Sequence, residues 1–275
     1  MSMASQTAQV ALPKLDLSTL RRAHGLWAMH GLLWIAVFAV LCSFIAVDDR
    51  AFQDVSLWKK PAKFSLSVGV YFLTLAWFAA FLPQDLWQTT RARIVGWIAV
   101  GTAGFEMIYI VVMAALGDAS HFNMSTPITS FMYSLMGIGA MTLTAVSPWL
   151  AFELLRAEPR WRHDAFLLAV VLGLLLTFLL GAGFGGYLGN RTSHWVNAPR
   201  TDAGGLPLFD WSRQGGDLRV AHFLGLHAMQ ALPLFALAVR GLARARTTVV
   251  AFALLYSAMT VYVFVQAVLG RPFLG

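Results

Sequence analysis

Two histidines open an apolar segment directly after the longest polar stretch of the chain. They are His222 and His227, and Arg219 precedes the first by three residues while Gln230 follows the second by three, so each neighbour shares a helical face with its histidine. Helical positions five apart differ by about 140° around the axis and about 7.5 Å along it. We therefore do not expect the two imidazoles to chelate one ion as an i, i+4 pair would. All four side chains are candidate cofactor-binding groups that need partners from elsewhere.

One carboxylate lies near the middle of a long apolar run. Glu106 falls within residues 94–116, and an acid at the centre of a bilayer costs about 2.5–3.5 kcal/mol. We expect this side chain to be protonated, paired or turned toward a polar cavity, which makes it a candidate catalytic group for proton transfer. The alternative is a neutral glutamic acid that makes one hydrogen bond between helices.

Further ionisable groups follow that run. His121 would lie about 22 Å beyond Glu106 if the segment were helical throughout, and the glycine before Asp118 allows the chain to turn back sooner. His194 lies in the polar stretch 190–219. Four histidines thus fall on one side of the membrane together with Glu106 and Asp118, and we predict that they converge. Asp118 is a second candidate catalytic group, and His121 is a further candidate for cofactor binding. The candidate metal ligands are His121, His194, His222 and His227.

The composition indicates the environment of these groups. Of 275 residues, 58% are hydrophobic and 12% charged, whereas soluble domains have roughly 45–50% and about 25%. Seven apolar runs approach the roughly 20 residues that a membrane-spanning helix needs. We predict an all-α, polytopic transmembrane helix bundle with a polar tail over 1–22 and one membrane domain over 23–275. The expected spans lie near 23–46, 64–82, 94–116, 127–152, 165–189, 220–239 and 248–270.

The loop charges predict an orientation in the membrane. With seven spans, one side carries 11 Lys and Arg against five Asp and Glu, and the other carries nine against seven. The positive-inside rule then places the N-terminus in the cytoplasm and the C-terminus outside, in a cell inner membrane. The net charge of +7 is explained by this bias, so no nucleic-acid partner is expected.

We expect no cleavable signal peptide. The single cysteine, Cys42, excludes an intramolecular disulfide and a cysteine-based metal site.

Two connections between spans stand out. Residues 47–63 combine aromatic side chains with Lys59, Lys60 and Lys63, a pattern typical of an anchor at the membrane interface. Residues 190–219 combine glycines, prolines and aromatic residues, and we expect them to form a lid over the outer mouth of the bundle. The glycine-rich run 181–189 lacks the context of a nucleotide loop and is explained by close helix packing.

These features favour a membrane redox protein, in which histidines at an outer cavity hold haem or a transition metal. Glu106 would relay protons, and a quinone or lipid-like molecule would be the small-molecule partner beside the lipid bilayer. One alternative is a zinc-dependent intramembrane hydrolase with Glu106 as its base. Another is a proton-coupled transporter that uses Glu106. A retinal protein is excluded because the last span, 248–270, contains no lysine.

Three phrases resemble signatures of an uncharacterised family of bacterial polytopic membrane proteins. They are Trp58–Ser67 (WKKPAKFSLS), Ala119–Asn123 (ASHFN) and Gly216–Phe223 (GDLRVAHF). This resemblance implies a bacterial setting and no mechanism. The seven-span count and the outer histidines also resemble the superfamily of alkaline ceramidases and progestin-receptor-like hydrolases. That superfamily has a His-x-x-x-His pair in its last span, whereas here the spacing is His-x-x-x-x-His in the sixth, so no residue roles are carried over.

Overall fold

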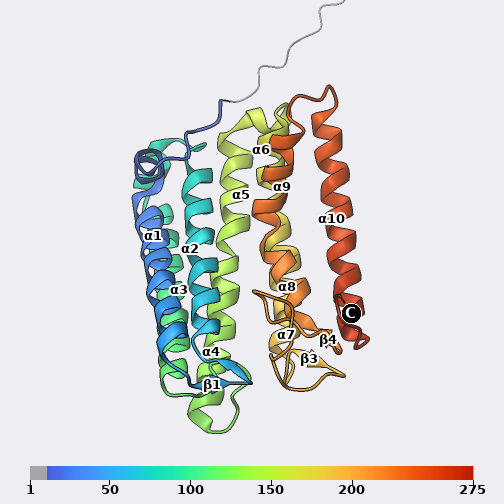
Figure 1. The fold of residues 1–275 in the computed structure, drawn as a ribbon. Helices are drawn as coiled ribbons and strands as arrows, with labels where there is room; N and C mark the ends of the chain where they lie inside the picture. Colours follow the sequence, from blue (N-terminus) through green and yellow to red (C-terminus); the bar gives the residue numbers. More distant parts are fainter. Residues whose placement is uncertain (1–10, 275) are drawn as a thin grey trace, which may run out of the picture.

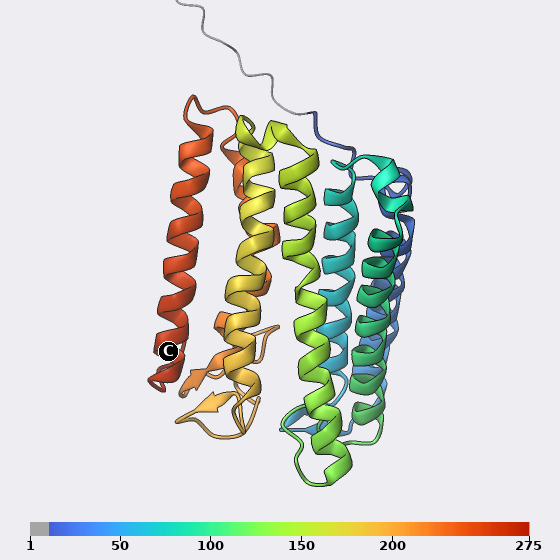
Figure 2. The same cartoon turned by 180° about the vertical axis from the view of Figure 1, so that it is seen from behind.

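The computed structural model describes residues 11–274, which fold into a bundle of roughly parallel helices (Figure 1 and Figure 2). The fold is all-α, as predicted, apart from two very short β-hairpins. The helices are α1 (Leu17–Val47), α2 (Lys59–Ala79), α3 (Thr90–Ala115), α4 (Pro127–Thr144), α5 (Val146–Ala157), α6 (Ala165–Leu176), α7 (Gly183–Gly189), α8 (Leu218–Leu226), α9 (Ala228–Ala238) and α10 (Ala245–Val268).

The helices have the length and composition of membrane spans. Six helical segments among the described residues are long and apolar enough to cross a bilayer, two of them formed by the joined runs Pro127–Ala157 and Ala165–Gly189. The pair α8 and α9 adds a seventh if it counts as one span, although it bends by 56°. The chain therefore fits a multi-pass helical membrane protein.

The two ends of the bundle differ in their connections. At one end lie the connections 48–58, 116–126 and 190–217 together with the end of α10, and we name it the histidine end (Figure 1). At the other lie the start of α1, the short helices η1 (Gln84–Gln88) and η2 (Pro159–Arg162), and the turn 239–244, and we name it the tryptophan end.

Side-chain caps fix where most spans begin. Asp16, Thr89, Asp164 and Asp217 each accept a hydrogen bond from a backbone N–H in the first turn of α1, α3, α6 and α8. Thr126 forms a capping box at the start of α4. Each cap satisfies a donor that the helix itself leaves unpaired. The polar loops and apolar runs thus meet at defined residues.

Large side chains fill the interior between the helices. Trp27, Phe72, Phe78 and Phe166 are each less than 2% exposed and belong to one core that joins α1, α2, α5, α6, α9 and α10. Helices α1 and α2 approach closely, since a Cβ on Gly69 would lie 2.7 Å from Ile35. Small residues allow such approach in membrane helices.

The connection 47–63 differs from the expected anchor. It forms a hairpin of β1 (Ala51–Phe52) and β2 (Val55–Ser56), whose turn residues Gln53 and Asp54 both have positive φ, as a two-residue hairpin turn requires. Helix α2 then begins at Lys59 instead of near residue 64. The three lysines of this region therefore lie on the first turns of a span.

The second long connection is folded onto the bundle. In residues 190–217, β3 (Trp195–Val196) pairs with β4 (Gly216–Asp217) in an antiparallel hairpin. The loop also reaches the first hairpin, because the backbone N–H of Asp202 donates to the carbonyl of Gln53 at 3.0 Å. Both connections thus pack together at the histidine end.

Candidate functional site

Two lysines fasten the 190–217 loop to the start of α2. Lys59 and Lys63, one helical turn apart, contact the two carboxylate oxygens of Asp210 at 3.0 and 2.9 Å. Lys63 also donates to the carbonyl of Phe209 at 3.0 Å. Burial raises the pKa of Asp210, but the hydrogen bonds from the two lysines outweigh it and hold that pKa below its ordinary value. Both ammonium groups therefore have a carboxylate partner, although the trio keeps one net positive charge.

Arg219 ties the same loop to α8. Its guanidinium contacts Asp217 at 2.7 Å and Asp202 at 2.8 Å, and it donates to the carbonyl of Asp210 at 2.8 Å. Asp217 is only 1% exposed. Burial raises the pKa of Asp217, yet hydrogen bonds with His194 and Arg219 hold it below its ordinary value, so the carboxylate remains charged.

His194 is buried between this network and aromatic rings. Its Nδ1 lies 3.5 Å from Asp217, longer than a good hydrogen bond, and its ring lies 3.8 Å from Trp195 and 6.0 Å from Phe122 between centroids. Burial lowers the pKa of His194, and Asp217 opposes this only in part. The imidazole is therefore neutral near pH 7.

The structure places His121 against Lys60. The ammonium Nζ lies 3.2 Å from Nδ1 of His121, and the Ser120 hydroxyl lies 3.1 Å from the same nitrogen. Because an ammonium can only donate, Nδ1 accepts and the proton of the neutral ring lies on Nε2. Burial lowers the pKa of His121 well below its usual value, and the charge of Lys60 lowers it further, as protonation of His222 or His194 would. Three of the four predicted histidines thus lie close enough to influence one another.

His222 has the opposite tautomer. Its Nδ1 lies 2.8 Å from the carbonyl oxygen of Gly181, which can only accept, so Nδ1 carries the proton and Nε2 a free lone pair. Gly181 belongs to a π-helical stretch, Thr177–Ala182, of the kind that often occurs at functional sites. Gly185 leaves room for the ring, because a Cβ there would lie 2.6 Å from Cε1 of His222.

These two imidazoles complement each other chemically. Nε2 of His121 can donate a hydrogen bond and Nε2 of His222 can accept one, and neither nitrogen is occupied by a hydrogen bond with the described residues. A neutral imidazole is too weak an acid to give up its Nε2 proton unless Nδ1 takes up another, and the ammonium of Lys60, 3.2 Å from Nδ1 of His121, can supply it. Aromatic rings border the pair, with Phe64 5.6 Å and Tyr133 6.2 Å from His121 between centroids.

His227 and Gln230 lie deeper along the same span. His227 is the residue at which α8 ends and α9 begins, so the helical-wheel argument, which assumed one continuous helix, does not describe the pair. Its ring lies 4.2 Å from Phe223. Gln230 donates to Thr74 at 3.1 Å, while its carbonyl oxygen finds no hydrogen-bond partner among residues 11–274.

The two predicted catalytic acids lie apart from the histidines. The carboxyl of Glu106 packs against α4, where a Cβ on Gly139 would lie 2.7 Å from Oε1, and this oxygen has no hydrogen-bond partner in the described chain. Asp118 is exposed in the 116–126 connection and accepts from the backbone N–H of Ala119 at 2.6 Å. The hydrogen bonds and ion pairs described for residues 11–274 join neither acid to His121, His194, His222 or His227.

The expected metal site is not assembled by these side chains. Among the described residues, no group of three or more His, Cys, Asp or Glu side chains could hold a metal ion. The histidines that gather are each turned toward a different partner: a lysine for His121, a carboxylate for His194 and a backbone carbonyl for His222.

Sequence reasoning missed the importance of Lys60. The lysines were interpreted as an interfacial anchor. However, the presence of three cations within five residues at the start of an apolar run indicated that they face polar partners inside the protein.

Comparison of the chain with protein-family models, with curated proteins and with solved structures finds no match.

Proposed function

We propose that the histidine end binds a lipid-soluble substrate through an oxygen atom and exchanges protons with it, with His121 passing on a proton from the Lys60 ammonium and His222 accepting one. The observation that carries this proposal is the pair of hydrogen-bond partners, each from a distant part of the chain, that assign opposite tautomers to the two rings. Each ring thus keeps its Nε2 free for the substrate, as general acid–base chemistry requires.

Lys60 supports the choice of an oxygen-bearing substrate. Its neighbours Lys59 and Lys63 share Asp210, whereas Lys60 has an imidazole and no carboxylate partner within 11–274. A half-buried ammonium beside a neutral ring leaves positive charge that a substrate oxygen can stabilise. The rings of Phe64, Phe122 and Tyr133 around the histidines favour a flat molecule.

A quinone-like molecule meets both conditions, and we propose a membrane oxidoreductase that handles it. Reduction of a quinone takes up two electrons and two protons at its carbonyl oxygens. His121, backed by Lys60, would supply one proton, His222 would relay the second from water, and a separate redox partner would supply the electrons. The charge bias of the loops supports our further proposal that this site lies on the outer side of a bacterial inner membrane.

The test is equilibrium binding of a short-chain quinone to the protein in lipid nanodiscs. We expect saturable binding that Lys60→Met and His222→Phe each weaken at least tenfold. Lys59→Gln is the matched control, since Lys63 still holds Asp210, and it should change the affinity much less. Absence of binding to the wild type, or an equal loss in all three variants, would contradict the proposal.

A second candidate is a haem protein with His222 as an axial ligand. The hydrogen bond from Nδ1 to a backbone carbonyl, with Nε2 left free, is the arrangement that orients histidines toward iron and other metals. This function would show as a Soret band in the purified protein or after haem is added. His222→Ala should abolish the band and His163→Ala, at the tryptophan end, should not.

A further inference from the structure

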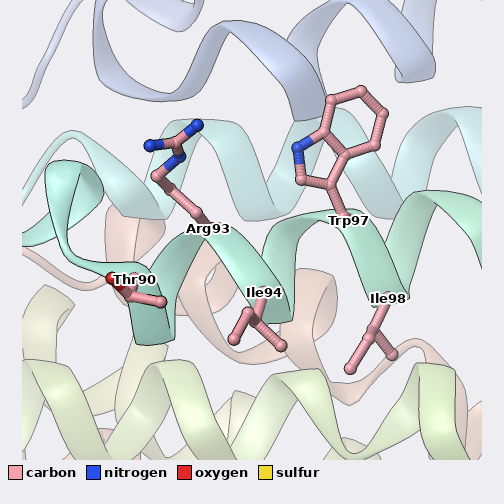
Figure 3. Close-up of a pocket in the computed structure, with 5 residues that line it drawn as sticks. All are labelled: Thr90, Arg93, Ile94, Trp97 and Ile98. Carbon is pink, nitrogen blue, oxygen red and sulfur yellow. The ribbon is translucent and has the colours of Figure 1, made fainter.

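Two hollows adjoin each other at the tryptophan end, far from the histidines. The first, of about 340 Å³, is lined by polar and apolar residues in similar measure, and its polar side chains include Arg22, His24, Gln84 and Gln88. The second, of about 370 Å³, is lined by Thr90 and by Arg93, Ile94, Trp97 and Ile98 of α3 (Figure 3). The first is the more polar of the two, and we name them the polar hollow and the apolar hollow.

Arg93 and Trp97 belong to both hollows and make them continuous. Figure 3 shows these two side chains extending from the same side of α3, with Ile94 and Ile98 following the opposite side. Trp97 is 62% exposed, and both isoleucines are exposed as well. Because α3 is a candidate membrane span, this apolar surface faces lipid.

The charge of the hollows has one sign. Arg22 and Arg93 line them and no acidic side chain does. The neighbouring Arg91 is paired with Glu153 at 3.1 Å, whereas Arg93 makes no ion pair with the described residues. Arg22 donates only to the hydroxyl of Ser18, at 3.1 Å. The two guanidinium groups are therefore available to an anion.

Helix α1 opens beside them. His24 has non-helical φ and ψ of −154° and 85°, and its ring stacks on Trp27 at 3.9 Å between centroids. Trp87 lines the polar hollow, and its buried indole N–H has no acceptor among residues 11–274. Buried donors normally find partners, so this N–H in the wall of the hollow points to an acceptor from outside the chain.

We propose that the two hollows together bind one anionic phospholipid from the surrounding leaflet. Its phosphate lies between Arg22 and Arg93 in the polar hollow, and an acyl chain follows Trp97, Ile94 and Ile98. Basic pockets beside membrane helices recognise anionic headgroups in this way. The apolar hollow distinguishes a lipid from free phosphate, which would use only the polar one. This site is independent of the chemistry proposed for the histidine end.

The test measures which lipids stay with the protein after transfer from mixed phosphatidylglycerol and phosphatidylcholine nanodiscs, by native mass spectrometry. We expect one phosphatidylglycerol to be retained with at least tenfold preference. Arg22→Gln and Arg93→Gln should each reduce the preference at least threefold, and both arginines are exposed, so the fold is preserved. Arg244→Gln, an exposed arginine at the same end, is the control and should retain it.

A second arm separates a lipid from a free anion. Trp97→Ala and Ile98→Ser should weaken retention of phosphatidylglycerol although they leave both arginines in place, and millimolar inorganic phosphate should not displace the lipid. Equal retention of the two lipids, equal loss in Arg244→Gln, or displacement by phosphate would each overturn the proposal. Quinone binding at the histidine end should be unchanged in all of these variants.

Discussion

The two ends of the bundle differ in how their charged groups are paired. At the histidine end, Asp210, Asp217 and Arg219 are paired at 3.0 Å or less, and Asp210 joins the 190–217 loop to α2. At the tryptophan end, Arg22 and Arg93 beside the two hollows make no ion pair with the described residues. Buried indole N–H groups without acceptors occur at both ends, so the contrast concerns the charged groups.

The difference shows how each end is held together. Ion pairs and loop packing enclose the histidine end. The site contains Lys60, whose ammonium contacts an imidazole and has no carboxylate partner in the described chain. Edge-to-face contacts between aromatic rings pack the tryptophan end, where Trp27 and Trp87 lie 5.5 Å and Trp87 and Trp149 6.0 Å apart between centroids. Disturbing charges should therefore damage the first end more than the second.

The largest loss is expected for Asp217→Ala. This change removes a buried partner of Arg219 and the cap of α8, and breaking a buried ion pair costs about 3–5 kcal/mol of unfolding free energy. Thermal unfolding in detergent should show a strongly lowered Tm. Asp202→Asn is the control, because Arg219 keeps Asp217 and Asp202 is more exposed. Equal losses in the two variants would show that burial of the pair is unimportant.

A smaller loss is expected for Gly216→Ala. An added Cβ would lie 2.0 Å from the carbonyl oxygen of Ala267, so β4 would have to move away from α10. Overpacking of this kind costs about 1–3 kcal/mol. Gly186→Ala in α7 meets nothing within 4 Å and should not lower the Tm. If Gly216→Ala unfolds at the wild-type temperature, the 190–217 loop is not docked as described.

Hydropathy predicted the helical fold because a bilayer demands long apolar runs with internal hydrogen bonds. It could not decide whether α8 and α9 form one span, since the break at His227 occurs inside an apolar run. Nor could it predict the hairpin at Gln53 and Asp54, whose residues take positive φ without a glycine.

The grouping of the histidines at one end could be predicted from the sequence, whereas their hydrogen-bond partners could not. Alternation of spans brings His121, His194 and His222 to the same end, and their functional role stays a prediction. Their tautomers depend on Lys60 and Gly181, which lie 61 and 41 residues away in sequence. Glu106 was expected to join them, but mid-span depth holds it against α4.

Acidification should destabilise the histidine end. His121 and His194 have lowered pKa values and are neutral in the folded protein, whereas in the unfolded chain they bind protons near the ordinary pKa of 6.5. The unfolded state thus binds more protons, and stability falls as the pH drops below about 6.5. The lowered pKa of Asp217 adds a loss only toward pH 4 and below. Tm measured from pH 7.5 to 5 should decrease, and His121→Gln with His194→Gln should flatten the profile.

The smallest effect compares two tryptophans of α1. Trp34 donates from its indole nitrogen to Nε2 of His30 at 2.8 Å, whereas Trp27 has no acceptor among residues 11–274. Both are buried, at 6% and 0% exposure, so replacement by phenylalanine removes similar packing from each. Trp34→Phe also leaves the His30 nitrogen unpaired, which should cost about 1 kcal/mol more than Trp27→Phe.

Anionic lipid extends this comparison to Trp87. If a lipid supplies the acceptor for the indole N–H of Trp87, which lines the polar hollow, Trp87→Phe should cost more in phosphatidylglycerol than in phosphatidylcholine nanodiscs. The cost of Trp34→Phe should be the same in both lipids. Tm measured for the two variants in the two lipids gives the four values needed. A lipid-independent cost for Trp87→Phe would mean that its indole stays unpaired, and that the contrast between the ends belongs to the chain alone.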